Sequence, residues 1–279
     1  MTIKISHWFG RTGNNIIQII NCIYYSFYMN NYRIISFPKH SLFLVNNIKN
    51  KNKVLQESKK IITDTFFYSK KLGFILEPYQ MREIAQKYMC DIVDFNLNTD
   101  IIKNNLSIHT RGGDAMNKGV FLLQNPLKLY KLFINSDKYN SIKIVYEDNI
   151  NPTTEHLKSL KNNKVSFQSL SVKKDLETLC SAENLLMSLS TFSLAVYFLS
   201  KNIKHIFIPK FMSDLWYPNM DWGLDTTKIN FEDYTVENWK KLSTKEKQIL
   251  LLSYNKEIII DFDIRNRSKK ENSTCNCCQ

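Results

Sequence analysis

The segment with the most potential chemistry reads His-Thr-Arg-Gly-Gly-Asp over residues 109–114 and begins at the end of an expected strand. His109 and Arg111 alternate along the strand end, so their side chains point to the same face. A guanidinium is permanently charged and can grip a phosphate through two parallel hydrogen bonds. We therefore expect Arg111 to hold a phosphate group and His109 to lie beside it.

The residues that follow Arg111 are compatible both with a phosphate site and with a purely structural role. Gly112 and Gly113 would leave room for a phosphate, because a glycine lets the backbone approach a ligand closely. Asp114 would hold the side chain of Arg111 or His109 in place. The alternative is a purely structural ion pair, buried, between Arg111 and Asp114.

A second segment with glycines lies near the N-terminus, at an expected junction between a strand and a helix. The N-terminus of a helix presents free N–H groups to anions, and glycines allow close approach. An ordinary turn is the alternative. The residues that would line a ligand-binding cleft here are Gly10, Arg11, Gly13 and Asn14. Nearby His7 could act as a general base or form a structural hydrogen bond.

A third segment, Leu-Ser-Thr-Phe-Ser over residues 189–193, also precedes an expected helix. Hydroxyl groups and backbone amides at a helix start can form a phosphate nest. The same residues are preferred as helix caps regardless of function. The candidates for binding are Ser190, Thr191 and Ser193.

Alternation of strands and helices predicts the elements that position these segments. Such alternation is typical of parallel, doubly wound sheets. Strands are expected at residues 3–9, 32–37, 72–76, 106–110, 142–146, 165–170, 185–188, 205–208 and 257–262. Helices are expected at residues 14–29, 77–90, 126–134, 153–160, 176–182, 192–200 and 232–252.

These elements predict an α/β fold of two Rossmann-like domains that face each other across a cleft. We expect an N-terminal acceptor-side domain over residues 1–103 and a donor domain over residues 104–230. A helical segment over residues 231–263 would cross back to the first domain, and residues 264–279 would be a disordered tail.

The three segments together resemble a known family. The first matches the G-x-x-G-N-x-x-x-Q pattern of bacterial α-1,2-fucosyltransferases, Gln18 included. The second matches the H-x-R-x-G-D motif that α-1,2-, α-1,6- and protein O-fucosyltransferases share, and the third matches their S-S/T-F-S motif. The motifs stand in the family's order over about residues 5–210, and Asp148 stands where the family carries an acidic turn.

This resemblance implies a GT-B fold, GDP-fucose as donor substrate, inversion at the anomeric carbon, and neither cofactor nor metal. By resemblance, Arg111 is the catalytic residue that steadies the departing GDP. The donor would also contact a set of residues from the second and third motifs and the acidic turn, namely His109, Gly113, Asp114, Asp148, Ser190, Thr191 and Ser193. The partners are then a nucleotide sugar and a glycan acceptor.

Three alternatives remain open. A transferase of the same fold could use another deoxysugar donor, such as a rhamnose nucleotide. A dinucleotide-binding oxidoreductase fits poorly, because the third glycine of G-x-G-x-x-G is missing and Phe37-Pro38-Lys39 stands where an acidic residue is expected. The net charge of +12 suits a nucleotide- or nucleic-acid-binding protein without transferase activity. The basic residues do not gather with aromatic ones, so we expect no nucleic acid partner.

We expect a cytoplasmic protein, because no apolar segment resembles a signal peptide or a membrane span. The C-terminal tail could nevertheless bring the protein to a membrane surface. It carries Arg265, Arg267, Lys269 and Lys270 before Cys275, Cys277 and Cys278. A polybasic segment with acylated cysteines would give weak peripheral membrane contact, and a tail with idle thiols is the alternative.

Overall fold

The computed structural model describes residues 2–30, 32, 34–50, 61–97 and 102–262. The chain forms two compact units, and each is described here by itself. The N-terminal unit consists of Met1–Ile102, Gln168–Ala182 and Ser190–Ile203. The C-terminal unit consists of Lys103–Phe167, Glu183–Leu189 and Lys204–Gln279.

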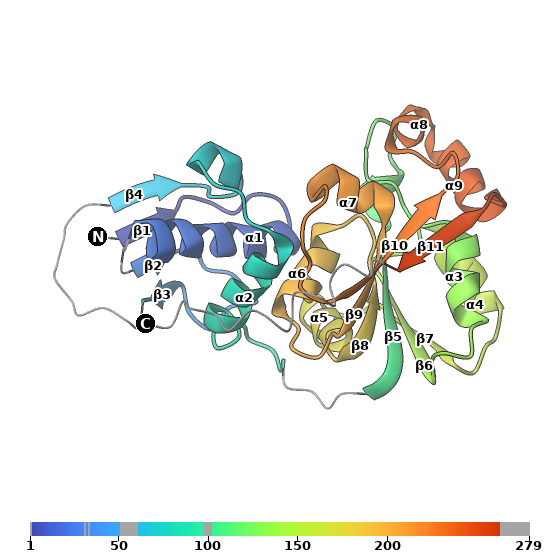
Figure 1. Cartoon of the computed structure of the whole chain (residues 1–279), viewed down its shortest axis with the longest axis horizontal. Helices are drawn as coiled ribbons and strands as arrows, with labels where there is room; N and C mark the ends of the chain where they lie inside the picture. The colour runs from blue at the N-terminus through green and yellow to red at the C-terminus, as the bar shows by residue number, and fades with distance from the viewer. Residues whose placement is uncertain (1, 31, 33, 51–60, 98–101, 263–279) are drawn as a thin grey trace. The chain divides into compact units, whose positions relative to one another are not determined.

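The N-terminal unit contains a four-stranded sheet in the order β3-β2-β1-β4 (Figure 1). Strand β1 pairs in parallel with both β2 and β4, whereas β3 is antiparallel to β2. The elements of this unit are β1 (Thr2–Ile5), α1 (Thr12–Ile23), a π-helical segment (Tyr24–Met29), β2 (Ile34–Ser36), β3 (Asn47–Lys49), β4 (Ile61–Asp64), a 3-10 helix (Ser69–Leu72), α2 (Pro78–Tyr88), α5 (Val172–Cys180) and α6 (Thr191–Leu199).

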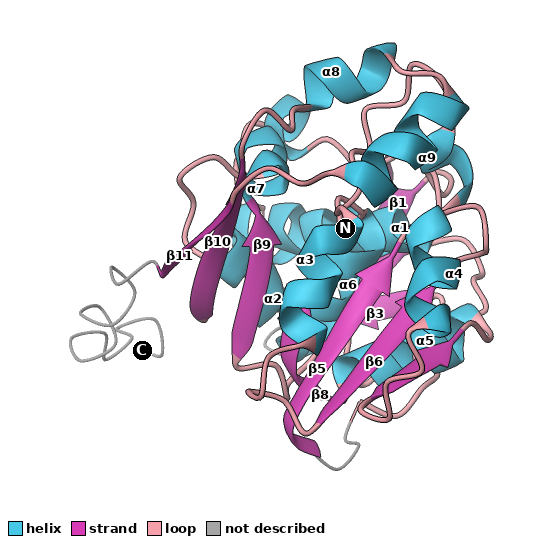
Figure 2. Cartoon of the chain, turned by 90° about the vertical axis from the view of Figure 1, so that its right-hand side faces the viewer, coloured by secondary structure: helices cyan, strands magenta, loops and turns pink. Residues whose placement is uncertain are grey.

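The C-terminal unit contains a seven-stranded sheet in the order β11-β10-β9-β8-β5-β6-β7, with β11 at one edge (Figure 2). Strands β5 and β6 are parallel, as are β8, β9 and β10, and β11 is antiparallel to β10. The elements are β5 (Ile102–Thr110), a 3-10 helix (Gly113–Met116), α3 (Leu127–Ile134), β6 (Ser141–Tyr146), α4 (Pro152–Ser159), β7 (Val165–Gln168), β8 (Ala182–Leu186), β9 (His205–Pro209), α7 (Lys210–Trp216), β10 (Asp225–Phe231), α8 (Val236–Lys241), α9 (Thr244–Ser253) and β11 (Ile258–Phe262).

The core of the C-terminal unit forms where side chains of the sheet meet α3. Ile108 of β5 and Ile144 of β6 are fully buried, and they belong to one apolar cluster with Tyr130 and Phe133 of α3. Burial of an aliphatic side chain of this size contributes roughly 1.5–3 kcal/mol. The core therefore fixes β5 and β6, whose carboxyl ends carry several of the predicted site residues.

The predicted α/β class with parallel sheets is confirmed. The strand predicted at residues 72–76 is wrong, because a 3-10 helix, Ser69–Leu72, ends there at Gly73, whose φ is +83°. The helix predicted at residues 232–252 is two helices, because the side chain of Ser243 caps a new helix start in a capping box with Glu246.

The division into units also differs from the predicted domain ranges. Helices α5 and α6 belong to the N-terminal unit, since α6 packs against α1 and α2, and α8 and α9 belong to the C-terminal unit. The predicted crossover of the C-terminal helix to the first domain stays a prediction. The predicted disordered tail lies outside the described residues.

Among the described residues, no helix is both long and apolar enough to cross a bilayer.

Candidate functional site

The order of strands in the seven-stranded sheet identifies where a ligand would bind. From β5 the chain continues to β6 and β7 on one side, and it then returns to β8 and β9 on the other side of β5. Open α/β sheets bind ligands at the carboxyl ends of the strands where the order reverses in this way. In this unit the reversal falls between β5 and β8.

Two polar side chains meet at this reversal point. His109 lies near the carboxyl end of β5, and Ser188 follows the carboxyl end of β8. The Nδ1 atom of His109 lies 2.9 Å from the Oγ atom of Ser188, at hydrogen-bonding distance, and both residues are buried. Ser188 was not among the predicted residues, because it is 79 positions from His109 along the chain.

Arg111 follows His109 and forms an ion pair. Its guanidinium donates a hydrogen bond of 2.7 Å to Oδ1 of Asp114. The side chain of Arg111 is 9% exposed and that of Asp114 is 55% exposed. The ion pair of the alternative hypothesis is therefore present, but the carboxylate of Asp114 is exposed to solvent. Because water hydrates this carboxylate, it can orient the guanidinium of Arg111 and would remain hydrated without it.

Asn151 fixes the backbone at Arg111. Its Nδ2 atom donates a 2.9 Å hydrogen bond to the carbonyl oxygen of Arg111, while its Oδ1 atom caps α4 by accepting from the backbone N–H of Thr153. Asn151 is buried. The residue was missed in the sequence because an Asn before Pro-Thr-Thr suits a helix cap and gives no sign of its second partner.

The two glycines after Arg111 face carboxylates. A Cβ atom on Gly112 would lie 1.9 Å from Oδ1 of Asp148, and one on Gly113 would lie 3.3 Å from its Oδ2. A side chain at position 112 would therefore collide with Asp148, and the room that Gly112 would leave for a phosphate stays a prediction. Asp148 also accepts a 2.8 Å hydrogen bond from the N–H of Ile150. A carboxylate here suits a ligand's hydroxyl or N–H donors.

A buried lysine holds the loop that follows the motif. The ammonium of Lys247 in α9 donates to the carbonyl oxygens of Asn117 at 2.5 Å, Val120 at 3.3 Å and Ala115 at 3.4 Å. It also lies 4.6 Å from the ring centroid of Trp239. Burial lowers the pKa of this ammonium. Sequence reasoning missed Lys247 because its partners are carbonyls more than 120 residues away.

The structure thus brings five predicted residues together in the C-terminal unit: His109, Arg111, Gly113, Asp114 and Asp148. The residues of the third motif belong to the N-terminal unit. There, the Oγ atom of Ser190 caps α6 by accepting from the N–H of Phe192 at 3.2 Å, which is the helix-cap alternative. Thr191 begins α6, and Ser193 is buried in its first turn.

The first motif also belongs to the N-terminal unit, where its two glycines have different roles. A Cβ atom on Gly13 would lie 2.3 Å from the backbone of Thr191, so Gly13 allows α1 and α6 to approach. Gly10 is exposed with φ +69°, and a Cβ atom there would meet Asn14. Arg11 is exposed before α1. Gly13 thus serves helix packing.

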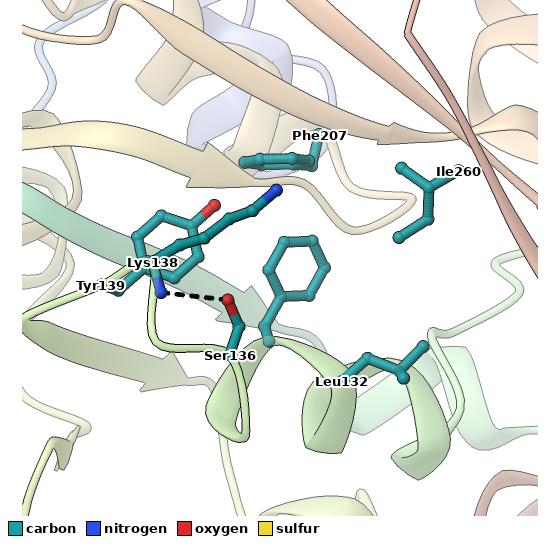
Figure 3. Close-up of a pocket in the computed structure, with 7 residues that line it drawn as sticks. Leu132, Ser136, Lys138, Tyr139, Phe207 and Ile260 are labelled. Carbon is teal, nitrogen blue, oxygen red and sulfur yellow. Dashed lines mark hydrogen bonds between the residues drawn. The ribbon is translucent and has the colours of Figure 1, made fainter.

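A cavity of about 270 Å³ lies elsewhere in the C-terminal unit. Figure 3 shows Leu132, Tyr139, Phe207 and Ile260 around it. Lys138 and Tyr139 precede β6, so the cavity adjoins the amino end of that strand. None of the predicted residues lines it, and we assign it no part in donor binding.

The described residues contain no cluster of three or more His, Cys, Asp or Glu side chains able to hold a metal ion.

Comparisons with known proteins give weak similarities. No family model matches the sequence, and no curated protein matches it. A crystal structure of POFUT1 in complex with GDP is 12% identical over 38% of this chain and 43% of that chain, with a TM-score of 0.26. POFUT1 in complex with GDP-fucose is 10% identical over 52% of each chain, with a TM-score of 0.31. The chain thus spans about half the length of the structures it matches, and we base no inference on likeness at these TM-scores.

Proposed function

We propose that this chain is an inverting glycosyltransferase that transfers L-fucose from GDP-fucose to a hydroxyl group of a glycan without a metal ion. The observation that carries the proposal is the position of the H-x-R-x-G-D segment. It begins in the last two residues of β5 and continues into the loop at the reversal point of the seven-stranded sheet, where α/β sheets bind ligands. We infer GDP-fucose as the donor from the three sequence motifs, which stand in the same order as in fucosyltransferases.

In the proposed reaction the bond between the anomeric carbon and the β-phosphate oxygen breaks as the acceptor hydroxyl oxygen attacks from the opposite face and releases its proton to water. Negative charge builds on the leaving diphosphate. The guanidinium of Arg111, oriented by Asp114 and by the Asn151 bond to its backbone, would stabilise that charge. Asp148 would accept hydrogen bonds from the nucleoside. Contacts of Ser190, Thr191 and Ser193 with the diphosphate stay a prediction.

A thermal-shift screen tests the choice of donor. GDP-fucose, GDP-mannose, UDP-rhamnose and dTDP-rhamnose would be titrated against the full chain. A nucleotide sugar at 100 times its Kd should stabilise the folded protein by about 2.7 kcal/mol. We expect stabilisation by GDP-fucose. Stabilisation by a rhamnose nucleotide alone would favour the rival donor, and no shift with any of the four would contradict the proposal.

We predict that transfer does not need a divalent cation. The proposed charge stabilisation comes from Arg111, a cation that can take the place of Mg²⁺ at a diphosphate. Dialysis against EDTA should leave the turnover number unchanged. If EDTA abolished transfer and Mg²⁺ or Mn²⁺ restored it, the proposed mechanism would have to be abandoned.

A further inference from the structure

The four-stranded sheet of the N-terminal unit has a reversal point of its own. From β1 the chain passes through α1 to β2 on one side, and it later reaches β4 on the other side of β1. Strands β1 and β4 are parallel, with Ile5 opposite Asp64, so their carboxyl ends meet. The loops after them, residues 6–10 and 65–68, emerge where α/β sheets bind ligands.

These two loops carry three aromatic rings in mutual contact, which we call the aromatic platform: Phe9, Phe67 and Tyr68. The ring centroid of Phe9 lies 4.6 Å from that of Phe67 and 5.8 Å from that of Tyr68, and the last two are 4.9 Å apart. Phe9 is 38% exposed and Tyr68 is 49% exposed. The platform therefore presents aromatic surface to solvent.

Buried amides of α1 hold both loops in place. The Nε2 atom of Gln18 donates to the carbonyl oxygens of His7 at 3.1 Å and Thr65 at 2.6 Å, and its Oε1 atom accepts from the N–H of Phe9 at 2.8 Å. Gln18 is fully buried. A buried amide is costly unless its partners are well placed, so this one fixes the loops relative to each other.

The second loop is also held in a strained conformation. Phe66 has φ +56°, in the left-handed region that a bulky residue rarely adopts. Asn21 of α1 donates to the carbonyl oxygens of Phe66 at 3.1 Å and Phe67 at 3.0 Å. Strain of this kind persists where the surroundings fix it and is concentrated at binding sites. The strained turn presents Phe67 and Tyr68 beside Phe9.

We propose that the aromatic platform binds a pyranose ring of the acceptor, an inference that rests on the proposed transferase function. One face of many pyranoses carries C–H groups, which pack against aromatic rings, while the hydroxyls project from the edge. Neighbouring residues supply polar partners for those hydroxyls. Nζ of Lys71 lies 5.0 Å from the ring centroid of Tyr68. The exposed His7 belongs to the first loop, with its Nδ1 atom 2.9 Å from Oγ of Ser6. A surface that alternates rings with polar groups suits a sugar better than a lipid.

Saturation-transfer NMR on the full chain tests this proposal, with the methyl glycosides of galactose, glucose and mannose as probes. We expect saturation of the ring protons of at least one glycoside. In the variants Phe9→Ser and Tyr68→Ser, the Kd of that glycoside should rise about 2- to 10-fold per ring. Tyr28→Ser is the matched control. Tyr28 is 48% exposed in the same unit, with Nζ of Lys87 6.0 Å from its ring centroid, and its ring contacts those of Tyr24 and Tyr88.

GDP binding, measured by calorimetry on the same samples, separates this proposal from the proposed function. If the platform variants bind glycosides like the unmodified chain, or if the unmodified chain binds GDP but no glycoside, the platform proposal is overturned. Saturation of a serine-containing peptide in place of the glycosides also overturns it. If glycosides need the platform but GDP does not bind, the sugar site stands and the proposed transferase function fails.

Discussion

Replacement of Arg111 by lysine should lower kcat by about 100- to 1000-fold, because a preorganised contact with the leaving diphosphate would be lost. Lysine keeps the charge but not the two parallel donors that match a phosphate. The contact strengthens as charge builds in the transition state, so kcat falls together with donor affinity. Turnover and melting temperature would be measured on the same samples of Arg111→Lys and Arg111→Ala.

Folding should survive both Arg111 substitutions. The carboxylate of Asp114 is 55% exposed, so water can hydrate it once the guanidinium is lost. Arg82→Lys is the matched control. The Arg82 guanidinium donates to the carbonyl oxygens of Ser200 and Ile203, so this variant should lose stability but keep its turnover. A well-folded Arg111→Ala variant with near-normal transfer would refute the donor-site assignment, and unfolding of that variant would favour the structural ion pair.

Replacement of Gln18 by leucine should lower the free energy of unfolding by about 2–5 kcal/mol, since each stranded buried polar group costs roughly 1–3 kcal/mol. The carbonyl oxygens of His7 and Thr65 and the N–H of Phe9 would all lose their bond to this side chain. Urea denaturation of the full chain measures the change. The milder variant Asn21→Ala removes only the two bonds to the strained turn and remains informative if Gln18→Leu does not fold.

Gln86→Leu is the matched control for Gln18. Its Nε2 atom donates a single bond, to the carbonyl oxygen of Ser200, which Arg82 also contacts. We therefore expect a loss below about 1 kcal/mol for this variant. Equal stability of the Gln18 and Gln86 variants would show that the amide of Gln18 is not what holds the two loops.

The fold was most predictable where apolar residues alternate. In β6, the buried Ile142 and Ile144 alternate with the half-buried Ser141 and Lys143, and the expected strand begins and ends within one residue of the observed one. Strand β10 was missed because two of its buried residues are Thr226 and Thr227, which give no apolar pattern. Its place beside β9 comes from tertiary pairing and overrides local propensity.

The candidate site was predictable only where its contacts are local. The ion pair of Arg111 with Asp114 spans three residues, so the motif contains both partners. The partner of His109 is Ser188, and Lys247 contacts a loop far from it in the chain. Nothing in a single sequence pairs residues so far apart. The contact between Gly112 and Asp148 could not be predicted for the same reason, since Asp148 follows the next strand.

The assignment of α5 and α6 to the N-terminal unit has a practical consequence for dissection of the protein. A fragment that ends at residue 103 would retain α1 and α2 but not α6, against which both pack. Arg82 would lose both of its carbonyl partners, and Gly13 would face solvent in place of Thr191. The N-terminal half studied alone would therefore lack part of its own core, so donor and acceptor binding are best measured on the intact polypeptide.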